Sequence, residues 1–175
     1  MKLTPEQIAS AKAKATRAFK AEEQKLALWA VCLIGWREPG PARFGDNRGS
    51  LPVRLAITSK KPEHASRDDD RFSPLMPVAT LEYVYVETEE HAKRLKDALD
   101  AILFGQQDAA GSSTCRGSYF NARDFFDDET TRGLWWAEVL REAQRRVMQK
   151  ATRFQLLSES DKQARITRGV AGGIR

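Results

Sequence analysis

The first part of the chain has apolar positions at helical spacing. Thr4, followed by Pro5 and, three residues after it, Gln7, forms a capping-box pattern that predicts a helix start. A weakly apolar stripe then continues to Leu26, with four lysines and Arg17 around it. The pattern predicts an N-terminal helix over residues 1–28.

Three segments have the pattern of strands. The continuous apolar run from Leu26 to Trp36 is typical of a strand that is buried on both faces. The segment from Leu51 to Thr58 alternates, and this predicts a strand with Val53, Leu55 and Ile57 on one face. A third strand is predicted from Val78 to Glu87, which is rich in Tyr and Val. Lys60 to Asp70 is polar and charged, and the three aspartates at its end are interpreted as a solvated loop.

Two further helices are predicted after the strands. Thr88 to Phe104 places its apolar residues on one side, and its first turn is acidic. A longer helix is predicted from about Thr131 to Leu157, with an apolar seam that begins at Trp136. The segment from Ser158 to Arg175 is polar and rich in glycine, so we expect it to fray. The predicted fold class is therefore α+β.

The composition suits a folded domain. The chain has 175 residues, of which 41% are hydrophobic, enough to bury a core. It contains no apolar run near the roughly 20 residues of a membrane-spanning helix, and its first residues lack the pattern of a secretory signal. We therefore expect a cytoplasmic protein with no membrane partner. Cys32 and Cys115 are too far apart for a metal-ligand motif, so both are interpreted as reduced thiols.

The charge of the chain indicates an anionic partner. The formal net charge is +5, and cations attract phosphate by a mechanism that does not depend on sequence. The C-terminal helix contributes the candidate nucleic-acid-binding residues Arg141, Arg145, Arg146, Lys150 and Arg153. Because acidic residues are interleaved with them, a simply solvated helix face is the alternative. The basic N-terminal helix has the same two interpretations: a solvated face, which we favour, or an arm that contacts DNA.

The order of short motifs in the middle of the chain resembles the GIY-YIG nuclease superfamily, in particular a branch found in phages and mobile elements. The counterparts of the family's motifs are Arg54-Leu55-Ala56-Ile57-Thr58, then Arg67, Pro77, Ala92-Lys93-Arg94-Leu95-Lys96 and Gly117-Ser118-Tyr119-Phe120-Asn121. The resemblance implies a small antiparallel three-stranded sheet flanked by helices. We accordingly divide the chain into an N-terminal helix (1–28), a GIY-YIG-like domain (29–125), a C-terminal helix (126–157) and a flexible tail (158–175).

The resemblance fails at the residue most important for catalysis. In the family, a glutamate after the helical leucine holds a divalent cation beside the scissile phosphate. Here that position is Lys96, whose ammonium group cannot bind Mg²⁺. Asp100, one helical turn further on, is the best substitute, although it would move the ion by about 6 Å. Ala56 also replaces the glycine of the second-strand motif.

Three hypotheses follow from the sequence. The first is a nucleic-acid-binding protein, with DNA favoured, whose degenerate nuclease domain needs no cofactor and whose former cleavage groove is lined by Arg54, Arg67 and Lys96. The second is an active Mg²⁺-dependent endonuclease that uses Arg67, Asp100 and Asn121. The third is a phage or mobile-element interaction module that binds a protein partner or forms a homodimer through its C-terminal helix.

Overall fold

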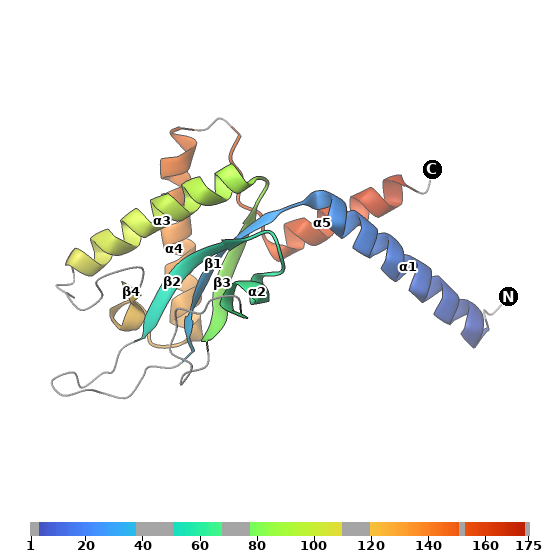
Figure 1. Ribbon diagram of the computed structural model, residues 1–175, viewed down its shortest axis with the longest axis horizontal. Helices are drawn as coiled ribbons and strands as arrows, with labels where there is room; N and C mark the ends of the chain where they lie inside the picture. The colour runs from blue at the N-terminus through green and yellow to red at the C-terminus, as the bar shows by residue number, and fades with distance from the viewer. Residues whose placement is uncertain (1–3, 38–50, 68–77, 110–119, 151–152, 174–175) are drawn as a thin grey trace.

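Five α-helices, a short 3-10 helix (Ala122–Asp124) and one antiparallel sheet occur in the part of the chain that the computed structural model describes, residues 4–37, 51–67, 78–109, 120–150 and 153–173. The predicted α+β class is confirmed. Figure 1 shows the sheet with α3 and α4 on one side, and α1 extending away from it.

The N-terminal helix, α1 (Pro5–Leu26), begins as its sequence predicts. The side chain of Thr4 accepts a hydrogen bond from the backbone of Gln7, and the side chain of Gln7 accepts one from the backbone of Thr4. The helix ends at Ala27, which has φ 43° and ψ 38°. This left-handed conformation turns the chain from the helix into the first strand.

The sheet has the strand order β3-β1-β2-β4, and all of its neighbouring strands are antiparallel. Its members are β1 (Trp29–Trp36), β2 (Pro52–Thr58), β3 (Val78–Val86) and β4 (Phe120–Asn121). The first three are the predicted strands. The fourth, only two residues long, is an addition to the three that we expected, because so short a segment has no periodicity that a sequence pattern can reveal.

The central strand, β1, is buried on both of its faces. Val31 and Leu33 point into one core, and Ala30, Cys32 and Ile34 point into another. β2 follows the predicted alternation, with Val53 and Leu55 in the first of these cores. The sheet therefore has helices over both faces, as a strand that is apolar throughout requires.

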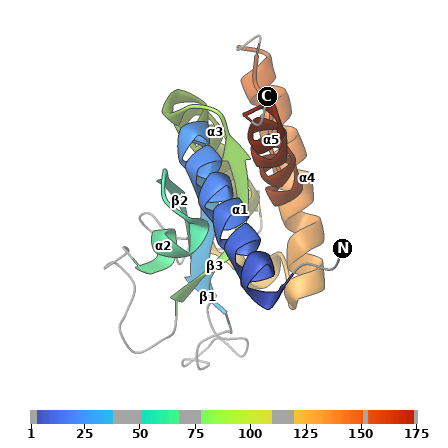
Figure 2. The ribbon, with the colours of Figure 1, turned by 90° about the vertical axis from the view of Figure 1, so that its right-hand side faces the viewer.

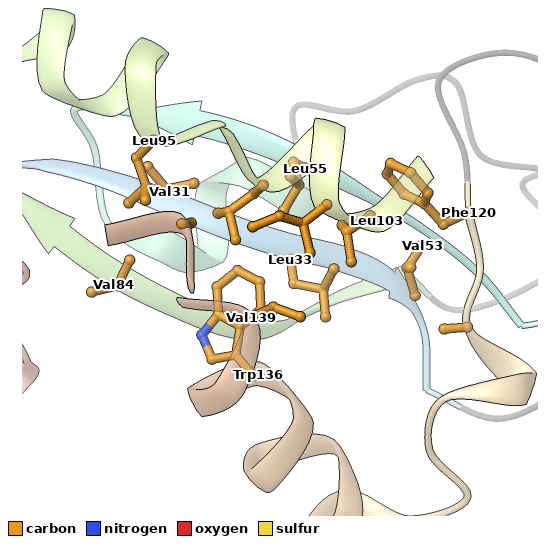
Figure 3. Packing of buried hydrophobic residues seen from close by; sticks show 14 of the residues in the cluster. Val31, Leu33, Val53, Leu55, Val84, Leu95, Leu103, Phe120, Trp136 and Val139 are labelled. Atoms are coloured by element: carbon orange, nitrogen blue, oxygen red, sulfur yellow. The ribbon is translucent and has the colours of Figure 1, made fainter. Parts of the chain in front are cut away.

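The first face carries the larger core (Figure 3). Two helices cover it, α3 (Glu89–Ala109) and α4 (Glu129–Met148). Leu95 and Leu103 of α3 and Trp136 and Val139 of α4 pack there on the sheet. The apolar seam of the C-terminal helix is thus buried in the protein's own core.

The second face is covered by a short helix, by Leu26 and Leu28, and by Leu157. The short helix, α2 (Pro62–Arg67), lies within the polar stretch for which we predicted no helix or strand; it forms there with Ala65 buried against Cys32 and Ile34. This contact lies far from Ala65 in sequence, so the local polarity did not reveal it. α1 and the last helix, α5 (Glu159–Gly172), cross beside this face (Figure 2).

The end of the chain corrects two predictions. α4 ends at Met148, not near Leu157, and residues 158–173 do not form a flexible tail. Leu157 instead pairs with Tyr85 through two backbone hydrogen bonds of 2.8 and 2.9 Å. Ser158 then caps α5, in which Ile166 is fully buried. The helix is held by these tertiary contacts, which its polar composition could not reveal.

Gly35 allows β1 and β2 to approach each other closely. A Cβ atom at this position would lie 2.5 Å from the backbone oxygen of Pro52. We expect Gly35→Ala to lower the free energy of unfolding by about 1–3 kcal/mol, because backbone atoms cannot move aside cheaply. Gly133→Ala is the control, since nothing lies within 4 Å of its Cβ position inside α4, and it should raise stability by about 0.5–1 kcal/mol. Urea unfolding of both variants tests this; equal stability of Gly35→Ala and wild type would contradict it.

Candidate nucleic-acid interface

A groove of about 640 Å³ lies between α3 and α4. Its walls carry three cations, Arg94 from α3 and Arg146 and Lys150 from α4 and the residues after it. Ala98 and Ala101 line the α3 side, where their short side chains leave room between the helices. Asp97 adds one carboxylate, so the groove has an excess of positive charge.

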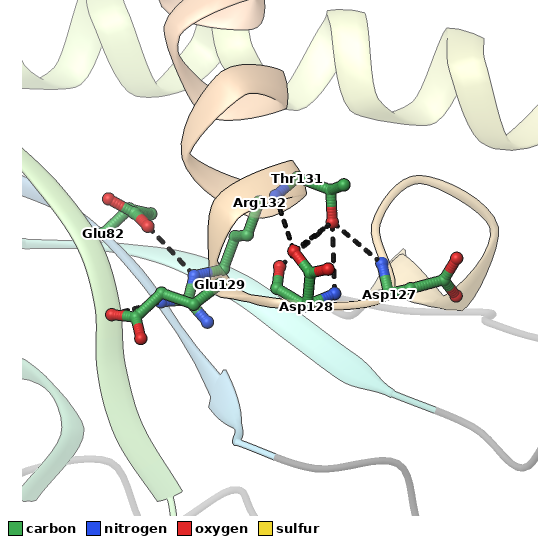
Figure 4. A network of polar contacts seen from close by, with 6 residues as sticks. All are labelled: Glu82, Asp127, Asp128, Glu129, Thr131 and Arg132. Carbon is green, nitrogen blue, oxygen red and sulfur yellow. Dashed lines mark hydrogen bonds and ion pairs between the residues drawn. The ribbon is translucent and has the colours of Figure 1, made fainter.

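Contacts at the other end of α4 fix how this helix lies on the sheet (Figure 4). Asp128 caps the helix by accepting a 2.8 Å hydrogen bond from the backbone of Thr131. Arg132, the next residue, donates a 2.9 Å hydrogen bond to Glu82 of β3, and both side chains are largely buried. Trp135 adds a hydrogen bond to Gln106 of α3. The groove is therefore formed by two helices that are anchored to the same domain.

One carboxylate in α4 is shared by two arginines. Glu142 accepts two hydrogen bonds from Arg145, of 2.9 and 2.8 Å, and a third of 2.8 Å from Arg146. These bonds, with that from Arg145 contributing most, lower the pKa of Glu142 to about 2. Since one negative charge faces two positive ones, the cluster keeps a net positive charge at neutral pH.

The remaining cations of the groove differ in their pairing. Arg94 forms an exposed ion pair with Glu90 of its own helix. Lys150 is exposed and has no ion pair within the described part of the chain. Arg94 was not among the predicted binding residues, because a sequence pattern does not show which flank of α3 meets α4.

The five predicted basic residues of the C-terminal segment do not form one stripe. A helix turns by about 100° per residue, so Arg141 lies roughly opposite the buried Ala143 and Val147, on the solvent side. Arg145 lies near Arg141, whereas Arg146 lies on the flank that borders the groove. Arg153 comes after the end of α4 and is exposed. Arg146 and Lys150 are therefore the two members that the structure brings into the groove.

Asp100, the predicted substitute for the family's metal-binding glutamate, forms an ion pair with Lys96, the residue at the position of that glutamate. The Nζ atom of Lys96 lies 2.5 Å from Oδ2 of Asp100, and both side chains are about a quarter to a third exposed. A cation at Asp100 would have to displace this ammonium group. The residues here do not fit a Mg²⁺ site, and no cluster of three potential metal ligands occurs among the described residues.

The other two predicted catalytic residues lie elsewhere. Arg67 ends α2 on the second face of the sheet and is exposed, whereas Asp100 belongs to α3 on the first face. Asn121 is buried, and its Oδ1 atom accepts hydrogen bonds from the backbones of Leu51 at 3.0 Å and Arg123 at 3.3 Å. Its position indicates a structural role, the attachment of β4 to the start of β2.

The predicted former cleavage groove is not a single surface either. Arg54 pairs in register with Ile34 and therefore points to the second face of the sheet. Arg67 lies on the same face, but Lys96 belongs to α3 on the first face. Lys96 and Arg94 are separated by about 200° around α3, so Lys96 lies outside the α3–α4 groove as well.

Some predictions concern residues outside the described ranges: Pro77, Cys115 and the segment 117–119 of the proposed motif. Of the cysteines, Cys32 is a buried free thiol. Burial raises its pKa to about 12, so it is not a nucleophile at neutral pH.

The pKa of Glu142 can be tested directly. By ¹³C NMR titration its side-chain carboxyl should change protonation near pH 2, and either Arg145→Gln or Arg146→Gln should move the transition toward the usual value near 4.5. Because the pKa is lowered in the folded state, the stabilising contribution is complete above pH 4.5 and is lost as the pH falls toward 2. A transition that stays at 4.5 in the wild type would show that the two pairs do not form in solution.

Comparisons of the chain with protein-family models, with curated proteins and with solved structures found no match. Among the described helices none is long and apolar enough to cross a membrane. We therefore assign the candidate interface from its geometry and charge alone.

Proposed function

We propose that this protein binds nucleic acid, with DNA as the favoured form, and that the groove between α3 and α4 receives a stretch of its phosphate backbone. The observation that carries the proposal is that Arg94, Arg146 and Lys150 line one groove. Residues 141–150 add to it, since this segment has four cations and one acid. Cations clustered in this way attract phosphates irrespective of sequence.

The chemistry of the cations favours phosphate as the ligand. A guanidinium group is a planar fork that binds two phosphate oxygens at once, and the lysine ammonium acts as a mobile point charge. Arg145 already uses this fork on the Glu142 carboxylate, to which Arg146 donates a single hydrogen bond. Arg94 meets Glu90 in the same exposed surroundings. Ion pairs this exposed contribute little free energy, so phosphates can replace the carboxylates as partners.

We further propose that the GIY-YIG-like domain is degenerate and does not cleave. Lys96, at the position of the family's cation-binding glutamate, neutralises Asp100 through a 2.5 Å ion pair. Arg67 and Asp100 lie over opposite faces of the sheet. No pair of the three predicted catalytic side chains is joined by a hydrogen bond or an ion pair in the described structure.

A double variant, Arg146→Gln with Lys150→Gln, tests the groove. Its affinity for a labelled DNA duplex, measured by fluorescence anisotropy, should fall, and the slope of log K against log salt should decrease by about 0.9 for each phosphate that is no longer neutralised. Arg37→Gln with Arg168→Gln removes the same charge from two exposed positions that do not line the groove, and it should change binding much less. Equal reductions of affinity in the two double variants would count against the groove. No binding by the wild-type protein to DNA or RNA at about 50 mM salt would end the proposal.

Glu142→Gln should change the affinity for DNA in the opposite direction. The substitution removes the one carboxylate that holds Arg145 and Arg146, so both guanidinium groups become available to phosphate. We expect tighter binding than in the wild type, by roughly 2- to 10-fold at about 50 mM salt. The matched control is Glu138→Gln, which removes one exposed acid from the same helix but not from an arginine pair. Weaker binding by Glu142→Gln would show that the carboxylate positions the arginines for the ligand.

A further inference from the structure

The N-terminal helix is long and packs little against the rest of the protein. None of the 22 residues of α1 is buried. Figure 1 shows it leaving the domain beside α5, with its N-terminus far from the sheet. Its tertiary polar contact comes near its C-terminal end, where Glu23 accepts a 2.7 Å hydrogen bond from Lys162 of α5. The first four turns therefore form an arm exposed on most of its surface.

After Glu6, the charge of this arm has one sign only. Residues 7–21 contain Lys12, Lys14, Arg17 and Lys20 and no acidic residue. The acids of the helix lie at its two ends, at Glu6 and in the pair 22–23. None of the four cations has an ion pair within the described residues. α3 and α4 differ, because their exposed cations are mostly paired at helical spacing.

The cations also lie close enough to repel one another. Lys14, Arg17 and Lys20 follow at steps of three, so neighbouring pairs share one side of the helix. Around the axis Lys14 and Arg17 lie away from Phe19, the apolar side chain that faces α5 and lines the cavity there. Lys12 lies on the side of Phe19, but two turns nearer the N-terminus, where the helix is exposed. Repulsion between unpaired like charges destabilises a helix, and an anionic partner would remove it.

A nucleic acid suits this surface better than a membrane does. An α-helix with side chains is roughly 10–12 Å across, close to the width of the DNA major groove. Membrane-surface helices need several large apolar side chains on the face opposite the charges. Here the apolar stripe has mainly alanines, with Ile8 the exposed large apolar residue of the arm.

We propose that α1 is a second nucleic-acid contact, in which Lys12, Lys14 and Arg17 bind backbone phosphates separately from the α3–α4 groove. This inference rests on the proposed function, because it assigns a further surface to the same ligand. The two surfaces belong to different helices: α1 packs on α5, whereas the groove is formed by α3 and α4.

The test removes three of the four charges of the arm. Lys12→Gln, Lys14→Gln and Arg17→Gln are combined in the full chain, and Lys20 is kept because it lies in the field of Glu23. The matched control exchanges the cations in place, with Lys12→Arg, Lys14→Arg and Arg17→Lys. Circular dichroism confirms that each variant keeps its helix content. Binding to a labelled duplex is then measured by anisotropy between about 50 and 200 mM salt.

The expected result is a smaller salt slope in the glutamine variant, by about 0.9 for each phosphate that the arm no longer binds. Each such phosphate accounts for roughly a 3- to 4-fold change of affinity over this range, so the three together should reduce the salt effect by roughly 40-fold. The charge-conserving control should bind as the wild type does. Amide hydrogen exchange adds a second readout, because residues 8–20 should gain protection when DNA binds.

Other results would overturn the inference. An unchanged slope in the glutamine variant, together with a reduced slope in the Arg146→Gln and Lys150→Gln variant, would reject the arm and keep the groove. A glutamine variant that loses binding only to anionic phospholipid vesicles would assign the arm to a membrane. If the wild-type protein binds no DNA or RNA at about 50 mM salt, the proposed function and the arm fall together.

Discussion

The burial of β1 on both faces is the constraint on which the rest of the structure depends. Six consecutive residues, Ala30 to Gly35, are buried, so two layers must cover the strand. α3 and α4 cover one face, and α2 covers the other together with Leu26 and Leu28 at the end of α1 and Leu157 before α5. This division explains why Arg67 and Asp100 lie apart, since each belongs to a different covering layer.

The two proposed binding surfaces result from this arrangement in different ways. The groove lies between α3 and α4, which are both anchored on the first face, and the small side chains of Ala98 and Ala101 line it. The arm exists because α1 meets the body only near its end, beyond which no partner among the described residues neutralises its lysines and its arginine. In one case the fold gathers cations from two helices, and in the other it leaves them unpaired.

The Lys96–Asp100 pair connects the family resemblance with the proposed lack of catalysis. A lysine at a position where the family has a glutamate is a change of sign, and the fold accommodates it with a carboxylate one turn away. An ion pair between residues four positions apart stabilises α3 slightly. The same two residues thus have a structural explanation that requires no ion.

The sequence determined the elements whose signals are local or periodic. The capping box at Thr4, the continuous apolar run of β1 and the alternation of β2 each predicted the observed element, because a helix cap and a buried strand are specified by their own residues. Only the tertiary structure decided the rest. α5 is polar and is held by Ile166 and by its packing on α1 and β3, and Asn121 is a structural residue because Leu51, 70 positions away, donates to it. The basic groove likewise needs Arg94 and Arg146, which are brought together by the packing of two helices that no sequence period connects.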